Sequence, residues 1–401
     1  MTDVTSIQPL FPEDRVLDGP LEKATELTGK ARKLLTESKG PVATALVPLL
    51  RSMNSYYTNK IEGQNTTPAK IEQALKREYS ADTEEYKKQL MATAHILAEE
   101  RLETEWRDVT TSEMFDPAKV RTIHRLFFEA LPDAFRLTTD DELIRPGEFR
   151  EKDLSVGRHM APPVDLIPPV LEEWSKRYKR IKGFEHQLIA TACSHHRLAW
   201  LHPFIDGNGR VCRLHSHLTL HASGLTDGLW SPLRGFARTH EEYYVRLSAA
   251  DQRRRNDLDG RGNLSQDELV KFIHYFLDCC LDQVNFMLKM MAFGDFRTRL
   301  RDLLSYLDAH PWHIGSEKSV IKPEKSALAL EFIAQTRPLS RAEFGQILGE
   351  SDATTRRITR SLLDFGILHS DSHRDDLSFE LPLKSLRFLF PKLWPEVDSE
   401  Q

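Results

Sequence analysis

The sequence has few cysteines and no long apolar run. Its first residues also lack the basic start and the apolar stretch of a secretion signal. Only four cysteines occur in 401 residues, and all lie in apolar segments with a helical pattern, at Cys193, Cys212, Cys279 and Cys280. We therefore expect buried free thiols in a reducing compartment rather than a disulfide framework. No apolar stretch reaches the roughly 18 residues of a membrane span. The first residues, Met-Thr-Asp-Val-Thr-Ser, do not resemble a secretion signal, so we expect a cytoplasmic protein with no membrane partner.

The charge balance argues against a chain that binds nucleic acid along its whole length. With 55 Lys and Arg against 60 Asp and Glu, the formal net charge is −5, whereas nucleic-acid-binding domains present a basic surface. Hydrophobic residues make up 40% and charged residues 29% of the chain, which is typical of a soluble globular protein. The length fits two or three domains.

Most of the chain shows the hydrophobic spacing and the start signals of helices. Thr67-Pro68 and Asp116-Pro117 are typical helix starts, and Ser265 with Glu268 forms a capping box. The exception is 149–159, where a loose alternation predicts a short β-hairpin. The predicted helices cover residues 21–38, 42–62, from 68, 83–104, 117–130, 169–181, 184–201, 209–221, 241–255 and 265–293.

The C-terminal part predicts a separate module. Helical patterns at 322–335, 339–348 and 352–365 precede a hairpin at 369–383, which is the order of a winged helix-turn-helix domain. Residues 321–401 contain 11 Lys and Arg against 13 Asp and Glu, a balance that favours protein contact or dimer support over DNA binding. The predicted division is an N-terminal helical region (1–105), a catalytic domain (106–310) and this module (320–401).

One short stretch gathers the chemistry of a phosphate site. Residues 202–210 read His-Pro-Phe-Ile-Asp-Gly-Asn-Gly-Arg, and Arg213 follows one turn later. Glycines let backbone N–H groups approach an anion, and a helix that begins there adds its positive end. Arg210 and Arg213 would project from one helix face and bind phosphate oxygens. Asp206 offers an oxygen ligand for Mg²⁺, and His202 a base. Alone, Asp-Gly-Asn-Gly is also an ordinary turn sequence.

The complete string resembles the signature of the Fic (filamentation-induced-by-cAMP) domain family, His-x-Phe-x-Asp/Glu-Gly-Asn-Gly-Arg-x-x-Arg. All eight fixed positions are filled, from His202 to Arg213. The resemblance covers about residues 40–295. It implies an all-α fold, namely a Fic-type helical domain with a small β-hairpin flap, followed here by the winged helix-turn-helix domain. It also implies transfer of AMP from ATP to a protein hydroxyl.

The resemblance assigns a role to each residue of the signature. His202 is the general base that deprotonates a Ser, Thr or Tyr hydroxyl, which fits the chemistry of an imidazole near neutral pH. Asp206 holds Mg²⁺ on the ATP phosphates, and Phe204 anchors the loop in the core. The other residues bind the phosphates: Gly207, Asn208 and Gly209 the α-phosphate, Arg210 the β-phosphate and Arg213 the γ-phosphate.

A second motif, Thr58-Asn-Lys-Ile-Glu62-Gly63, resembles the family's inhibitory helix, Ser/Thr-x-x-x-Glu-Gly/Asn. The resemblance implies that Glu62, at the end of the predicted helix 42–62, pairs with Arg213. A carboxylate in the γ-phosphate position would turn the α-phosphate of ATP away from attack. The alternative is a solvated glutamate at a helix end.

Further residues of the nucleotide site follow from weaker similarities. Val156, Gly157, Arg158 and His159 resemble the flap that lines the nucleotide and docks an extended target segment by strand addition; the alternative is a plain surface hairpin. Tyr243-Tyr244 resembles an adenine-side pair. Asp251 stands where many members have Asn, seven residues after the second tyrosine.

Two other patterns are interpreted as structural. The histidines that flank the signature, His195, His196, His215 and His217, are expected to be hydrogen-bonded inside the fold. Residues 257–268 spell much of an EF-hand loop. However, Arg261 occupies a ligand position, and three arginines precede the stretch, so we expect a connector rather than a Ca²⁺ site.

The sequence thus predicts a protein adenylyltransferase that uses ATP and Mg²⁺ and is inhibited by its own Glu62. Its partner would be a protein that presents a hydroxyl in an extended segment; self-modification and a homodimer are open alternatives. Two other functions also stay open. One is a DNA-binding regulator with the Fic domain as nucleotide sensor, and the other is a different reaction at the same site, such as UMP, phosphate or phosphocholine transfer or de-AMPylation.

Overall fold

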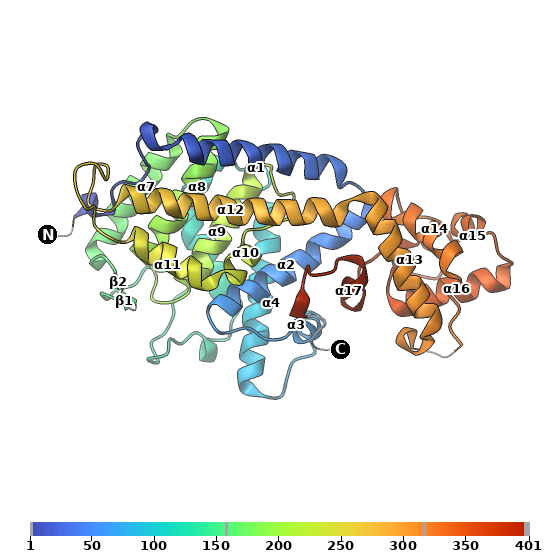
Figure 1. Ribbon diagram of the computed structural model, residues 1–401. Helices are drawn as coiled ribbons and strands as arrows, with labels where there is room; N and C mark the ends of the chain where they lie inside the picture. Colours follow the sequence, from blue (N-terminus) through green and yellow to red (C-terminus); the bar gives the residue numbers. More distant parts are fainter. Residues whose placement is uncertain (1–2, 157–158, 316–317, 397–401) are drawn as a thin grey trace. The chain divides into compact units, whose positions relative to one another are not determined.

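A computed structural model describes residues 3–156, 159–315 and 318–396, and most of them are helical (Figure 1). The all-α class is confirmed. The helices are α1 (Asp18–Glu37), α2 (Pro41–Ile61), α3 (Pro68–Leu75), α4 (Thr83–Glu105), α5 (Thr111–Met114), α6 (Pro117–Glu129), α7 (Ile167–Lys179), α8 (Phe184–Leu201), α9 (Asn208–Ala222), α10 (Leu233–Arg238), α11 (His240–Ala250), α12 (Gln266–Met291), α13 (Phe293–Ala309), α14 (Pro323–Gln335), α15 (Arg341–Leu348), α16 (Asp352–Phe365) and α17 (Leu386–Leu389). The strands are β1 (Ser155–Val156), β2 (His159–Met160), β3 (Leu368–His369) and β4 (Ser378–Phe379).

The chain divides into two compact units, each formed by separate segments. The first contains the described residues of Met1–Arg32, Asn54–Thr66 and Lys70–Asn285, and the second those of Lys33–Met53, Thr67–Ala69 and Phe286–Gln401. The division into domains 1–105, 106–310 and 320–401 stays a prediction. No helix among the described residues combines the length and the apolar character that a membrane crossing needs.

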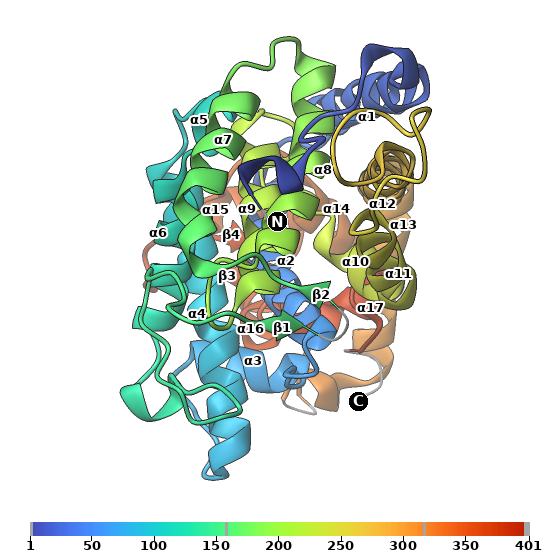
Figure 2. The ribbon, with the colours of Figure 1, turned by 90° about the vertical axis from the view of Figure 1, so that its left-hand side faces the viewer.

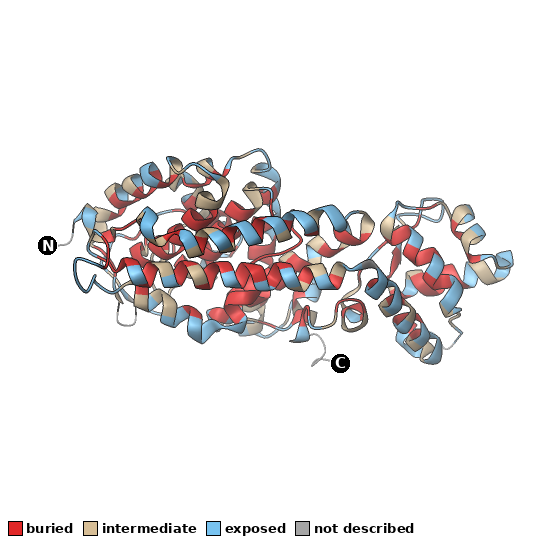
Figure 3. Cartoon of the chain, turned by 45° about the horizontal axis from the view of Figure 1, so that its top comes forward, coloured by how far each residue is buried: buried red, intermediate tan, exposed pale blue. Residues whose placement is uncertain are grey.

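The centre of the first unit is the pair α8 and α9. The two helices pack side by side (Figure 2), with α4, α5 and α6 against α9 and with α7 and α11 against α8. The last two-thirds of α8 is buried at nearly every position, including the polar residues Ser194, His195, His196 and Arg197. The outer helices carry a buried and an exposed side (Figure 3). Any residue at the α8–α9 junction is therefore fixed by surrounding helices.

Helix starts were predicted better than helix ends. Asp82 caps α4 by accepting from Glu85 N at 2.8 Å, and Ser265 accepts from Glu268 N at 3.1 Å at the start of α12. The predicted helix 241–255 is wrong at its end, because α11 stops at Ala250. The chain turns back there, and Arg253 and Leu264 pair as an antiparallel bridge. Helices α5, α10, α13 and α17 were not predicted.

The hairpin predicted at 149–159 is much shorter than expected. Its paired residues are Ser155 with Met160 and Val156 with His159. The segment before it is not a strand, because Arg150 N donates to Pro203 O at 2.9 Å and so ties the backbone to the signature loop.

The second unit contains the predicted order of three helices and a hairpin. Helices α14, α15 and α16 precede the antiparallel pair β3–β4, and a bridge between Leu339 and Leu377 extends the pairing. Ile358, Leu362 and Phe365 of α16 are buried, so this helix packs through an apolar face. The assignment as a winged helix-turn-helix, and its choice between protein and DNA, stay predictions.

In the EF-hand-like stretch, the carboxylates of Asp259 and Glu268 already have partners within the protein. Asp259 accepts from Ser265 Oγ at 3.0 Å and from Asp267 N at 2.8 Å. Glu268 pairs with Arg255 at 2.9 Å and Lys271 at 2.8 Å. These contacts agree with a connector that leads into α12.

We predict that the core of the first unit depends strongly on Leu102. This side chain on α4 is fully buried, whereas Leu97 on the same helix is 55% exposed. Leu102→Ala should lower the free energy of unfolding by ~2–5 kcal/mol, because it removes buried apolar contacts and leaves a cavity. Leu97→Ala, the matched control, should change it by less than ~0.5 kcal/mol. Urea denaturation measures both; equal losses would contradict the prediction.

Candidate nucleotide site

The signature begins where α8 ends in a left-handed turn. His202 has φ 49° and ψ 60°, which ends α8, and α9 begins at Asn208. The Asn208 amide closes the intervening loop: Oδ1 accepts from Phe204 N at 2.9 Å, and Nδ2 donates to Phe204 O at 2.7 Å. Phe204 is buried and stacks on His124 with ring centroids 4.0 Å apart. The expected anchoring role of Phe204 is present, and Asn208 has a bracing role that sequence reasoning missed.

Gly207 allows the tight approach that precedes α9. Its φ is 78°, and a Cβ atom there would lie 2.6 Å from Phe128 Cε2. Only glycine meets both conditions without strain. No side chain in the described residues caps the start of α9, so its first N–H groups remain available to an anion.

Arg213 is a buried cation held by the segment that carries the second motif. It is 1% exposed. Its Nε donates to Thr58 Oγ1 at 2.8 Å, its Nη2 to Thr58 O at 3.2 Å, and Nη2 also forms an ion pair with Glu62 Oε1. The structure therefore brings together the two residues whose pairing the resemblance implied.

Gly209 provides the space for that ion pair. A Cβ atom at this position would lie 2.4 Å from Glu62 Oε1 and 3.1 Å from Arg213 Nη1. Burial alone would raise the pKa of the Glu62 carboxyl, but the charges of Arg213 and Arg210 outweigh it and the pKa is lowered. Glu62 is therefore a carboxylate near neutral pH.

Arg210 is bound to the same segment. Its guanidinium donates to Gln64 Oε1 at 3.1 Å and to Asp206 Oδ1 at 3.3 Å, and it lies 4.9 Å from the ring centre of Phe127. Asp206 Oδ1 also accepts from Gly207 N at 2.5 Å. Gln64 was missed, although its position just after Glu62-Gly63 was a usable signal.

These residues surround one cavity of about 380 Å³. Nine predicted residues line it: Glu62, His159, His202, Asn208, Gly209, Arg213, Tyr243, Tyr244 and Asp251. Asp206, Gly207 and Arg210 belong to the same loop and helix start but are not part of that lining. Gly157 and Arg158 lie outside the described residues.

Tyr243 and Tyr244 differ in burial and in their hydrogen-bond partners. Tyr243 is buried, and its hydroxyl contacts His195 Nε2 at 2.7 Å. Tyr244 is 46% exposed and donates to Ile61 O at 3.3 Å. Asp251 lies 3.2 Å from His196 Nε2 and 3.6 Å from His159 Nδ1, so its carboxylate is engaged with two imidazoles.

His202 has the properties of a base. Desolvation by partial burial lowers the pKa of its imidazole to about 4, so the ring is neutral at physiological pH. A second missed residue, the buried Arg150, holds this turn: its Nε donates to His202 O at 2.9 Å and Nη1 to Lys152 O at 2.7 Å, and Nη2 donates to Pro162 O. Arg150 thus links the turn at His202 to both ends of the flap.

Comparison with known proteins decides the family of this part of the chain. Residues 114–220 match the model of the Fic/DOC family. The chain therefore contains a Fic/DOC domain. The matched range includes the signature but not Glu62, and it is shorter than the range 40–295 expected from the resemblance.

The relatives of the Fic/DOC domain are distant. "Protein adenylyltransferase Fic" of Drosophila willistoni is 28% identical and that of Drosophila erecta 38% identical over 139 residues, 34% of this chain. The match spans about a quarter of these curated relatives' own length, 24%.

Two solved structures share the fold. A Fic family protein from Desulfovibrio desulfuricans G20 has a TM-score of 0.51 at 16% identity and covers 90% of this chain and 96% of that one. A Fic domain containing signaling protein from Bacteroides thetaiotaomicron VPI-5482 has a TM-score of 0.50 at 18% identity, with 67% and 96% covered.

The Fic/DOC domain offers a direct test of Gly207. Gly207→Ala should lower the free energy of unfolding by ~1–3 kcal/mol more than Gly224→Ala, and it should abolish nucleotide binding. Both glycines have positive φ, 78° and 71°, but a Cβ atom at Gly224 meets nothing within 4 Å. Urea denaturation and ATP titration of both variants give the comparison. Equal behaviour would show that the Phe128 contact does not matter.

Proposed function

We propose that this protein is an adenylyltransferase that transfers AMP from ATP to a hydroxyl of a target protein and is held inactive by Glu62. The observation that carries the proposal is the shared cavity. The neutral imidazole of His202, the start of α9 and the buried Arg213 all line it, and Arg213 forms an ion pair with Glu62. The names of the Drosophila relatives support the reaction class.

The residues divide the chemistry as follows. His202 removes the proton of the attacking hydroxyl, whose oxygen forms a bond to the α-phosphorus. The bond from that phosphorus to the bridging oxygen breaks, and pyrophosphate leaves. The N–H groups at the start of α9 stabilise the charge on the α-phosphate oxygens. Arg210 and Arg213 bind the departing phosphates bidentately.

The residue predicted to hold Mg²⁺ fits that ion. Mg²⁺ keeps one or two carboxylate ligands and completes its shell with water and phosphate oxygens. The Asp206 side chain is 38% exposed, and it lies beside Arg210, at the phosphate end of the site. Bound there, the ion would neutralise charge on the phosphates of ATP.

Inhibition follows from the partners of Arg213. The two hydrogen bonds that Arg213 donates to Thr58 fix the orientation of the guanidinium, and Glu62 supplies the negative charge that pairs with it. A γ-phosphate must displace this carboxylate, because both need the same Nη2 group. A charged hydrogen bond contributes ~1.5–3 kcal/mol, so its removal should favour productive ATP binding about 10- to 100-fold.

We expect Glu62→Gly protein with MgATP to gain the mass of AMP on itself or on a lysate protein. Wild type should gain none or much less, and Glu62→Gly/His202→Ala should gain none, because the base is missing. Glu72→Gly, a change at an exposed glutamate of α3, is the matched control and should behave as wild type. Intact mass spectrometry measures all four.

The same experiment separates the alternatives. If folded Glu62→Gly protein labels nothing with ATP, the adenylyltransferase proposal fails. Labelling with UTP or CTP instead would leave the Fic chemistry but change the transferred group. Loss of AMP from a labelled protein on addition of wild type would favour de-AMPylation.

The rate should depend little on pH through the base. Burial lowers the pKa of His202 to about 4, below the ordinary value, so the neutral form persists as the pH falls. We therefore expect the rate of AMP transfer by Glu62→Gly protein to stay level from about pH 8 to about pH 5. A fall centred near pH 6.5, measured with MgATP in excess, would contradict this assignment.

A further inference from the structure

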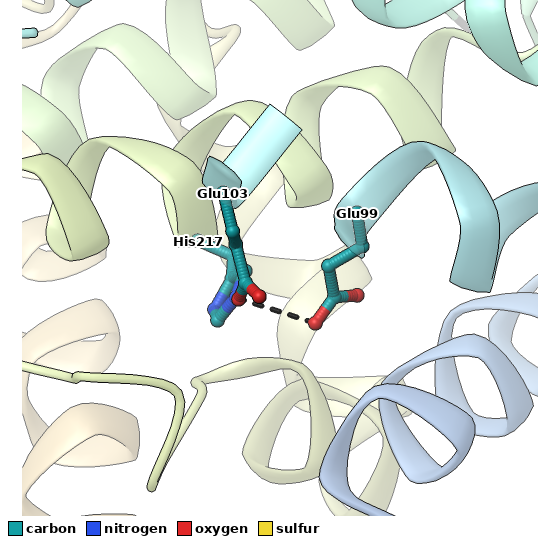
Figure 4. Close-up of side chains that lie close together, drawn as sticks. All are labelled: Glu99, Glu103 and His217. Carbon is teal, nitrogen blue, oxygen red and sulfur yellow. Dashed lines mark hydrogen bonds and ion pairs between the residues drawn. The ribbon is translucent and has the colours of Figure 1, made fainter. Parts of the chain in front are cut away.

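A second polar cluster lies inside the first unit, away from the nucleotide. Glu99 and Glu103 stand one turn apart on α4, and His217 faces them from α9 (Figure 4). His217 Nε2 lies 3.0 Å from Glu103 Oε1 and 3.3 Å from Glu99 Oε1. One donor atom from each residue falls within 4.8 Å of the others. None of the three is among the residues that line the cavity of the nucleotide site.

This cluster is buried. Glu99 and His217 are each 1% exposed, and Glu103 is 5% exposed. Two carboxylates in such a place need positive charge, because isolated buried ions are strongly unfavourable. His217 supplies one such charge when its imidazole is protonated.

Neighbouring atoms also lack partners. Glu99 Oε1 accepts from Asn54 Nδ2 at 2.8 Å, but Glu99 Oε2 has no hydrogen bond to any described residue. His95 is fully buried, its Nδ1 lies 3.5 Å from Glu99 Oε2, and neither of its ring nitrogens bonds to the residues described. Buried polar atoms are rarely left in this state, so Glu99 and His95 have bonding capacity that the described residues do not use.

We propose that Glu99, Glu103 and His217 bind a divalent transition metal of the zinc class. One imidazole nitrogen and two carboxylate oxygens are a typical donor set for zinc. Ligand distances of about 2.0–2.2 Å in a tetrahedral site place neighbouring donor atoms roughly 3.3–3.6 Å apart. His217 Nε2 lies 3.0 and 3.3 Å from the two carboxylate oxygens, and all three donor atoms lie within 4.8 Å of one another. The ion would place positive charge beside the carboxylates, with His95 next to Glu99 and Asn54 orienting Glu99 as an outer partner.

Such a metal would be structural. It would join α4 to α9, one turn beyond Arg213 on the same helix, and so hold the helix that carries both phosphate-binding arginines. The three groups are closed in by packed helices, so substrate would not reach the ion. This site is independent of the transferred group and of inhibition by Glu62.

The test is metal binding by the full-length, untagged protein. Wild type stripped with a chelator and titrated with Zn²⁺ should bind one ion per chain and unfold at a higher temperature when loaded. Glu103→Gln and Glu99→Gln keep the side-chain shape, and each should bind Zn²⁺ about 100-fold more weakly or worse, because even outer partners contribute about 10- to 100-fold. Calorimetry, elemental analysis and thermal unfolding measure these effects.

The matched control is Glu105→Gln on the same helix. The Glu105 side chain is 46% exposed and pairs with Arg101, so this variant should bind Zn²⁺ as wild type does. Should a glutamine variant not fold, Co²⁺ loaded into wild type should give the intense visible bands of a tetrahedral site. No Zn²⁺ uptake by wild type, unchanged uptake by both folded glutamine variants, or only a weak octahedral Co²⁺ spectrum would overturn the proposal.

Discussion

The compensation of one buried cation, Arg213, organises the site. A guanidinium that is 1% exposed must have hydrogen-bond acceptors and a negative charge, because an unpaired buried ion would destabilise the fold by several kcal/mol, typically ~3–5 kcal/mol. Thr58 and Glu62 supply both. The end of α2 is thus bound to α9 by the same group that is proposed to bind ATP, and this makes stability and the proposed inhibition parts of one interaction.

The loop beside that cation is rigid for reasons that are separate from catalysis. The Asn208 amide bonds to both the backbone N–H and the carbonyl of Phe204. At Gly207, Phe128 leaves no space for a Cβ atom. Arg150 then fixes the carbonyl of His202. The proposed base and the proposed anion-binding helix start are therefore held in place before any substrate arrives, which is how electrostatic stabilisation becomes effective. In the proposed mechanism only Glu62 has to move.

The sequence predicted elements better than their extents. Capping residues marked the starts of α6 and α12, since the cap chemistry is local. The predicted end of α11 was wrong because Arg253 pairs with Leu264, and the two residues meet only when the chain folds back. The predicted hairpin was too long because the backbone of Arg150 bonds to Pro203 and not to the opposite strand. Boundaries set by distant partners leave no local signal.

By itself the sequence determined which chemical groups residues 202–213 offer. Their types and their spacing, glycines included, lie within one short segment of the chain. It also indicated Glu62 as the partner of Arg213, through a family motif. The tertiary structure alone decided which groups complete the site and which form a second cluster. Arg150 reaches the end of α8 from the loop before β1, and Gln64 reaches Arg210 of α9 from the segment after α2. Glu99 and Glu103 of α4 meet His217 of α9. These partners lie far apart in the chain, and only the tertiary packing brings their polar atoms together.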